Sequence, residues 1–254
     1  MGYAPELLEA VRKILNETRQ DRLCREYLAS HPSPSGLGPF LGSIEPAFLF
    51  LGLNPAGYDV AEYPSGAEDY LDFATRYFKQ KNTDKASFAA YLPYASINTA
   101  DYETFGEVAM AAHVVPIPTK RANEIPPRLL TPCWARTMKL VAAVRPKLVL
   151  VHGAAVWKFL AGVEESGGPQ LTHLPESHKV ALNTLIETVE ADKLPFQSGF
   201  AGAPDDFKPW LVALPHLGGA GGPKAQREKL DRAVREARRL MHGVKAGVRI
   251  RKPV

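Results

Sequence analysis

The stretch Ala47-Phe-Leu-Phe-Leu-Gly-Leu53, followed at once by Asn54-Pro-Ala-Gly57, decides the fold class of this chain. An apolar run with no polar alternation is typical of a strand that is buried on both faces, as in a parallel sheet covered by helices. The turn-forming residues Asn54 to Gly57 then end the strand. The sequence therefore predicts an α/β protein.

Three more segments have the character of core strands, and amphipathic helices separate them. The strands are expected over 108–117, 147–152 and 210–214, and a further strand near 180–186 within the Gly- and Pro-bearing excursion 164–207. The helices are expected over 5–19, 21–29, 67–79, 132–144, 154–161 and 224–242. Alternation of this kind predicts a three-layer α/β/α architecture around a central, mostly parallel four-stranded sheet. We expect a single domain, with N-terminal helices over 4–30, a core over about 45–242 and a basic tail over 243–254.

Composition narrows the class of protein. The 254 residues are 45% hydrophobic and 23% charged, which is ordinary globular usage and argues against a disordered or fibrous chain. No apolar run approaches the length of a membrane span, and the N-terminus does not resemble a secretory leader. We therefore expect a monomeric cytoplasmic protein without a membrane partner. The net charge of +4 is concentrated after Lys224, where basic residues outnumber acidic ones, so this end is either a solvated helix face or a contact for nucleic-acid phosphates.

The potential metal and redox ligands are few. Cys24 and Cys133 are too few for a disulfide framework or a cysteine-ligated iron–sulfur cluster, and we expect two buried thiols, with a single disulfide as the alternative. His173, Glu176 and His178 have a spacing that suggests a metal site, but Pro175 argues against one ligand-bearing helix and favours a solvated loop. The sequence predicts no metal and no cofactor.

In a parallel sheet, ligands bind beyond the carboxyl ends of the strands, and three such ends carry unusual loops. The loops are Asn54–Gly57, His113–Asn123 and His216–Gly219. The amide of Asn54 offers both a donor and an acceptor, although an Asx turn before proline is the simpler interpretation. His216 opens a glycine-rich loop, although a lone histidine is more often structural. That loop lacks the Gly-Lys-Ser/Thr ending of a phosphate loop.

Taken together, three blocks in this order resemble the uracil-DNA glycosylase superfamily, over roughly residues 45–240. Gly52-Leu-Asn-Pro-Ala-Gly57 is similar to the first motif of the mismatch-specific and single-strand-selective branches. His113-Val-Val-Pro-Ile-Pro-Thr-Lys-Arg-Ala-Asn123, followed by Arg145-Pro-Lys-Leu-Val-Leu-Val-His-Gly-Ala-Ala155, resembles their second strand, proline-rich loop, helix and third strand. Leu214-Pro-His-Leu-Gly-Gly219 stands where the family has its His-Pro-Ser loop.

The resemblance implies base excision, in which a flipped base is held at the strand ends and its N-glycosidic bond is cleaved. Asn54 matches the residue that orients the attacking water, and His216 matches the histidine that stabilises charge on the leaving base. Leu217 matches the wedge that enters the duplex. The resemblance further implies a base pocket formed by Gly52, Pro55, Ala56, Gly57, Tyr58, Phe73, His113 and Leu217, where Tyr58 and Phe73 either stack on the base or serve packing. It also implies DNA contacts by Lys120, Arg121, Gly218, Gly219, Lys224 and Arg227.

The chain departs from the family pattern at three places. His113 stands where the family has an asparagine that reads the uracil edge, and a neutral imidazole still offers one donor and one acceptor. The serine of the His-Pro-Ser loop is replaced. The cysteines of the iron–sulfur branches are absent. Two other functions therefore stay open beside the glycosylase: a catalytically weak or inactive nucleic-acid-binding module on this fold, and an enzyme acting on a small nucleoside-like ligand.

Overall fold

The structure is a computed structural model that describes residues 3–31, 36–55, 62–77, 106–119, 124–163 and 169–214, together with 235, 239 and 240. Its strands are β1 (Phe40–Gly42), β2 (Phe48–Gly52), β3 (Ala109–His113), β4 (Leu148–His152), β5 (Phe196–Gln197) and β6 (Trp210–Leu214). Its α-helices are α1 (Pro5–Gln20), α2 (Arg22–Ser30), α3 (Ala67–Arg76), α6 (Leu130–Val144), α7 (Ala154–Ala161) and α8 (Leu182–Thr188). Three short 3-10 turns, η2 (Pro127–Leu129), η3 (Glu176–His178) and η4 (Ala191–Lys193), complete the described elements.

The strands form one mixed sheet with the order β1-β3-β2-β4-β6-β5. The four strands predicted from the sequence are its centre, and they pair in parallel. The expected total of four strands is wrong, because β1 and β5 add an antiparallel strand at each edge. These edge strands have three and two residues, too few to show a periodicity in the sequence.

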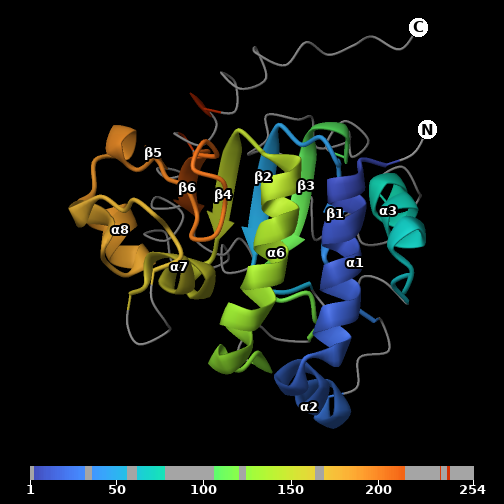
Figure 1. Cartoon of the computed structure of the whole chain (residues 1–254). Coiled ribbons are helices and arrows are strands. Elements are labelled where there is room, and N and C mark those ends of the chain that lie inside the picture. Colours follow the sequence, from blue (N-terminus) through green and yellow to red (C-terminus); the bar gives the residue numbers. More distant parts are fainter. Residues whose placement is uncertain are drawn as a thin grey trace, which may run out of the picture.

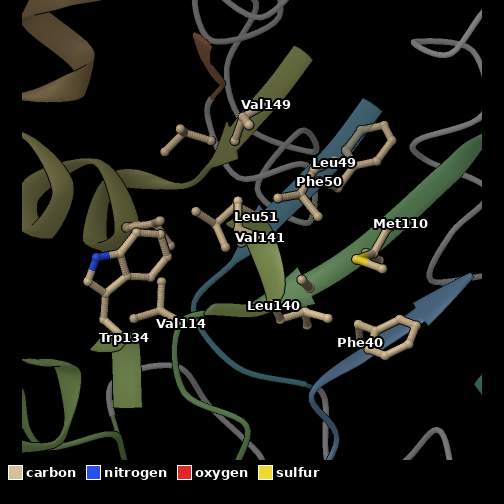
Figure 2. Packing of buried hydrophobic residues seen from close by; sticks show 14 of the residues in the cluster. Phe40, Leu49, Phe50, Leu51, Met110, Val114, Trp134, Leu140, Val141 and Val149 are labelled. Carbon is tan, nitrogen blue, oxygen red and sulfur yellow. The ribbon is translucent and has the colours of Figure 1, made fainter. Parts of the chain in front are cut away.

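Burial explains why the central strands are continuously apolar. Leu49 and Leu51 alternate with Phe48 and Phe50 along β2, so they point to opposite faces of the sheet, and all four are buried. The expected burial on both faces is confirmed. Figure 2 shows Leu51 beside Val141 of α6, which places Leu49 and Leu51 on the α6 side. The second helical layer of the predicted three-layer arrangement stays a prediction.

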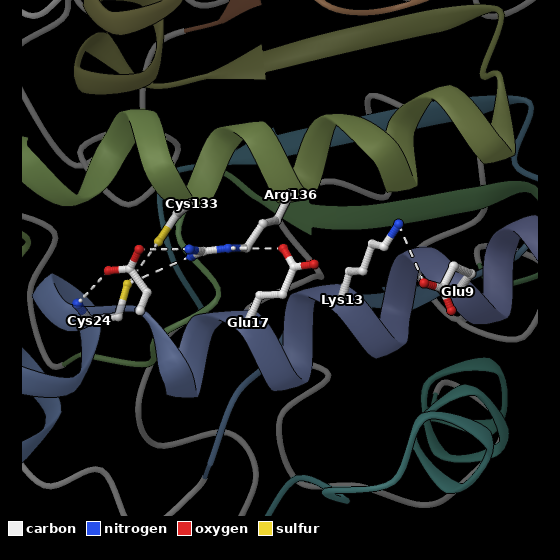
Figure 3. Close-up of polar contacts among 7 residues, drawn as sticks. Glu9, Lys13, Glu17, Cys24, Cys133 and Arg136 are labelled. Atoms are coloured by element: carbon white, nitrogen blue, oxygen red, sulfur yellow. Dashed lines mark hydrogen bonds and ion pairs between the residues drawn. The ribbon is translucent and has the colours of Figure 1, made fainter.

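Helices α1 and α6 lie side by side across one face of the sheet (Figure 1). A polar cluster joins them at the end where α1 passes into α2 (Figure 3). Arg136 of α6 pairs with Asp21 at 2.7 Å and lies 3.7 Å from a carboxylate oxygen of Glu17. Cys24 and Cys133 are buried free thiols whose Sγ atoms are 3.6 Å apart, so the expectation of buried thiols is confirmed.

The segment between α7 and β6 is packed rather than loop-like. The strand predicted near 180–186 is wrong, because Leu182, Leu185 and Ile186 lie at helical spacing and form the buried side of α8. The indole of Trp157 donates a hydrogen bond to the carbonyl of Val180 at 2.9 Å and holds this segment against α7. Of the helix predicted over 224–242, the structure describes Arg235, Arg239 and Leu240, which are helical.

In the described part of the chain, no helix has both the length and the apolar character needed to cross a membrane.

Candidate functional site

Strands β2 and β3 end side by side, as the sequence predicted. Their parallel register pairs Gly52 with His113. The pairing continues past the strand ends, because the N–H of Val114 donates to Gly52 at 2.9 Å and the N–H of Val115 donates to Leu53 at 2.8 Å. The loop that carries Asn54 and the loop that follows His113 therefore meet at one edge of the sheet.

The side-chain amide of Asn54 is anchored across these two loops. Its Nδ2 donates to Thr119 Oγ1 at 2.7 Å and to the carbonyl oxygen of Pro55 at 3.0 Å. A carbonyl only accepts, so the nitrogen must be on this side and Oδ1 on the other. Among the described residues Oδ1 has no hydrogen-bond partner. The anchored amide thus presents an acceptor of fixed direction.

The imidazole of His113 is held in one tautomer. Its Nδ1 lies 3.1 Å from the carbonyl oxygen of Gly38, which can only accept, so Nδ1 carries the proton. Burial lowers the pKa of His113 to about 4, against the opposing effect of the carbonyls of Gly38 and Pro39. The ring is therefore neutral at pH 7, and Nε2 carries a lone pair. Nε2 has no hydrogen-bond partner in the described part of the chain.

Gly38, whose carbonyl holds this imidazole, packs against Tyr63. A Cβ atom on Gly38 would lie 2.8 Å from the ring carbon Cζ of Tyr63, so only glycine admits the tyrosine ring here. Tyr63 in turn packs edge-to-face against Phe73 of α3, with ring centroids 5.8 Å apart. Phe73 also contacts Tyr77. These contacts are the packing role that the sequence left open for Phe73, and its role as a base-stacking ring stays a prediction.

Gly52 lies against the ring of His113. A Cβ atom on Gly52 would lie 3.4 Å from Cδ2 of His113, so the ring rests against the glycine backbone. On the other side of β2, Leu51 pairs with Val151 of β4, so His152, which follows Val151, points to the same sheet face as Gly52, which follows Leu51. His113, Gly52 and His152 then share the sheet face opposite α6.

Sequence reasoning missed His152, Thr119 and Gly38. His152 is buried and ends β4, and a signal existed, because it is the polar last residue of an apolar strand, as His113 is in β3. Thr119 and Gly38 gave no signal, since each acts on a residue more than sixty positions away in the chain.

Pro55 is buried, and its carbonyl oxygen accepts from Asn54 and, at 3.3 Å, from the N–H of Thr119. β6 ends two residues before His216, and the N–H of Gly153 donates to Leu214 at 2.8 Å, so β6 ends beside β4 at this same edge. The remaining predicted site residues lie outside the described residues: Ala56, Gly57, Tyr58, Lys120, Arg121, His216, Leu217, Gly218, Gly219, Lys224 and Arg227.

The histidines of the 173–178 segment do not form a common site. The solvated loop expected there is wrong for His178, which is buried, lies 3.2 Å from the carbonyl of Leu194 through Nε2 and packs edge-to-face on Phe196. Burial lowers its pKa. Within the described ranges no three His, Cys, Asp or Glu side chains gather as a metal site would require.

No protein-family model and no curated protein matches this chain.

Proposed function

We propose that this chain is a monofunctional DNA glycosylase, which hydrolyses the N-glycosidic bond of uracil or a related deaminated or damaged base flipped out of DNA. One observation carries the proposal. Asn54 is anchored by Thr119 and Pro55 so that its Oδ1 is an acceptor without a partner among the described residues, at the strand edge where the neutral His113 also presents an acceptor. A fixed acceptor for water beside a fixed acceptor for a base is what hydrolytic base release needs.

Asn54 acts on water by orientation. Its Oδ1 accepts a hydrogen bond from the water and directs the water's lone pair at the sugar carbon C1′, since an amide is too weak a base to take the proton. The water oxygen bonds to C1′ as the bond between C1′ and the base nitrogen breaks with its electron pair going to the base. The proton that the water loses passes to solvent, and the released base takes up a proton from solvent. His216, which the family resemblance assigns as a donor to the base oxygen, stabilises that negative charge.

His113 reads the base through Nε2. An acceptor at this point pairs with a ring N–H, which uracil, thymine, hypoxanthine and xanthine all offer and which the unmodified adenine and cytosine rings lack on their pairing edge. The family asparagine offers a donor as well as an acceptor from one amide. The Nδ1–H of His113 is already bonded to the carbonyl of Gly38, so His113 offers the base an acceptor only. We therefore expect it to discriminate less among bases that carry a ring N–H.

The first test is release of base from end-labelled single- and double-stranded oligonucleotides. Each oligonucleotide contains one uracil, hypoxanthine, xanthine or mismatched thymine, and alkali then breaks the strand at abasic sites. We expect alkali-dependent cleavage on at least one substrate. Strand breakage without alkali would contradict a monofunctional enzyme.

Two variants test the site. Asn54→Ala is expected to lower the single-turnover rate by a factor of about a hundred or more, and His216→Ala by about the same factor. Asn183→Ala, which removes an exposed amide on α8, is the matched control and should leave the rate unchanged. Wild-type rates in both site variants would contradict the assignment. No release from any substrate, with salt-sensitive DNA binding retained, would favour the inactive binding module.

A further inference from the structure

A groove lies at the opposite end of the sheet from Asn54. It has a volume of about 600 Å³, opens to solvent, and is formed where the chain enters β4 and β6. Its lining residues are Arg145, Pro146, Lys147, Gln197, Asp206, Phe207, Lys208, Pro209, Trp210, Arg239 and Leu240. Because β4 and β6 are parallel and the candidate site is at their carboxyl ends, this groove at their amino ends is a separate surface.

The groove contains an exposed aromatic platform. Trp210 is 37% exposed and is the only large hydrophobic side chain of the described residues that is exposed. Its backbone is fixed, because its N–H donates to the carbonyl of Lys147 at 3.0 Å and it pairs with Leu148 and Gln197 on the two neighbouring strands. An indole at the start of a central strand therefore faces solvent from a rigid position.

Positive charge surrounds this platform. Arg145, Lys147, Lys208 and Arg239 line the groove against a single carboxylate, that of Asp206. Asp206 pairs with Arg145 at 2.8 Å, and the guanidinium of Arg145 also stacks 5.6 Å from the ring centroid of Phe207. Lys147 and Lys208 are exposed and have no carboxylate partner in the described part of the chain. The positive charges of Lys147 and Lys208 are thus left without a carboxylate among the described residues.

We propose that this groove binds a segment of single-stranded nucleic acid, with a base stacked on Trp210 and phosphates paired with Lys147 and Lys208. An exposed aromatic ring beside unpaired cations is the combination that single-strand binding uses, since every base has a face that stacks and every phosphate is negative. The open shape suits a chain that passes through the groove rather than a small molecule enclosed by it. This binding does not depend on the glycosylase activity proposed above, and it gives the chain a nucleic-acid contact away from the reacting base.

Tryptophan fluorescence reports on the groove directly. Trp134 and Trp157 are 2% and 0% exposed, so iodide in solution quenches the emission of Trp210 selectively. We would titrate the full chain with an undamaged oligothymidylate of about 12 nucleotides, within the usual size of single-strand sites. Binding should shield Trp210 from iodide. Asn54→Ala should bind equally well, which separates this surface from the catalytic proposal.

Variants then assign the binding to the groove. Trp210→Ala should weaken the affinity, measured by anisotropy of a labelled oligothymidylate, by a factor of about 5 to 150, and Trp210→Phe should retain part of it. Lys147→Glu combined with Lys208→Glu should weaken binding further and lower the salt slope by about 1.4. The matched control is Lys179→Glu with Lys193→Glu, which changes the net charge equally at exposed lysines outside the groove.

Four results would overturn the proposal. The first is that the oligonucleotide does not shield Trp210 from iodide, and the second is that Trp210→Ala binds with unchanged affinity. The third is that the control pair of lysine variants loses as much affinity as the groove pair. The fourth is that thymidine monophosphate, or a poly-glutamate peptide at matched charge, shields Trp210 equally well. The last would assign the groove to a free nucleotide or to an acidic protein segment. If Asn54→Ala loses base release while the oligonucleotide still shields Trp210, the result concerns the catalytic proposal and leaves the groove proposal intact.

Discussion

Thr119 contacts Asn54 through its side-chain hydroxyl. Its hydroxyl accepts the Nδ2 hydrogen bond at 2.7 Å and so helps fix the direction of Asn54 Oδ1. Thr119→Val keeps the shape and removes the acceptor, and loss of one hydrogen bond corresponds to about a tenfold lower single-turnover release rate. Thr119→Ser should restore the rate, because serine keeps the hydroxyl.

Base release by the two Thr119 variants, with unchanged affinity for the substrate, checks this positioning role. Thr188→Val, on the exposed side of α8, is the control and should behave as wild type. Equal rates for Thr119→Val and Thr119→Ser would show that the hydroxyl does not orient Asn54.

His113 links stability to pH. Burial lowers its pKa from the ordinary 6.5 to about 4, so between these two values the unfolded chain holds a proton that the folded chain does not. The free energy of unfolding therefore falls as pH falls through this window, by on the order of 3 kcal/mol at most. In His113→Gln this part of the pH dependence should be absent.

Urea denaturation of wild type and His113→Gln at pH 7 and pH 4.5 measures the effect. The wild type should lose more stability than the variant on acidification, while the contribution of His178, whose pKa is also lowered, cancels between the two proteins. Parallel losses would show that His113 is not neutral in the folded state.

At the scale of elements, Asp21 joins three helices. Its carboxylate accepts the N–H of Cys24 at 3.0 Å as the cap of α2, and it pairs with Arg136 of α6 at 2.7 Å. Partial burial opposes its ionisation, but these two contacts outweigh burial and lower its pKa below the ordinary 3.8. The charge of Asp21 therefore stabilises the folded chain at neutral pH, and this stabilisation is lost as pH falls through the lowered pKa.

Two substitutions separate the cap from the ion pair. Asp21→Asn keeps the capping oxygen and loses the charge, whereas Asp21→Ala loses both, so Asp21→Ala should be the less stable by about 1 kcal/mol. Thermal or urea unfolding at pH 7 should show that wild type is more stable than Asp21→Asn, and that Asp21→Asn is more stable than Asp21→Ala. Toward pH 3 the stability of wild type should approach that of Asp21→Asn. An Asn variant as unstable as Ala would assign the whole effect to the ion pair.

The elements also show where sequence patterns mislead. The β-branched residues Val180 and Ile186 favoured a strand, but the apolar positions of α8 are spaced for a helix, and α8 packs against α7. The central strands and α1 were predicted within a few residues, because continuous apolar runs that end at turn residues, and the helical spacing of apolar residues in α1, are specific patterns. The edge strands β1 and β5 are set by pairing with β3 and β6, which no local pattern shows.

For the whole molecule, α1 is part of the single core rather than an appendage. Val11, Ile14 and Leu15 of α1 are buried, and α1 packs against α6 and α3. Ile14→Ala should cost about 2–5 kcal/mol of unfolding free energy, while the exposed Asn16→Ala on the same helix should change it by less than about 0.5 kcal/mol.

Urea unfolding followed by circular dichroism and by tryptophan emission tests this arrangement, since Trp134 lies on α6. Both probes should give one shared transition in wild type and in the variant. A separate early transition in circular dichroism alone would indicate that α1 unfolds independently of the sheet.

The sequence by itself determined the α/β class, the four central strands, most helices and the two strand ends that carry Asn54 and His113, because hydrophobic periodicity and turn residues are local properties. Only the tertiary structure decided the strand order, the contact of Thr119 with Asn54, and the tautomer that Gly38 imposes on His113. It also decided the groove around Trp210. Each of these joins residues far apart in the chain, and which distant partners meet is set by the packing of the whole core rather than by the pattern of any one segment.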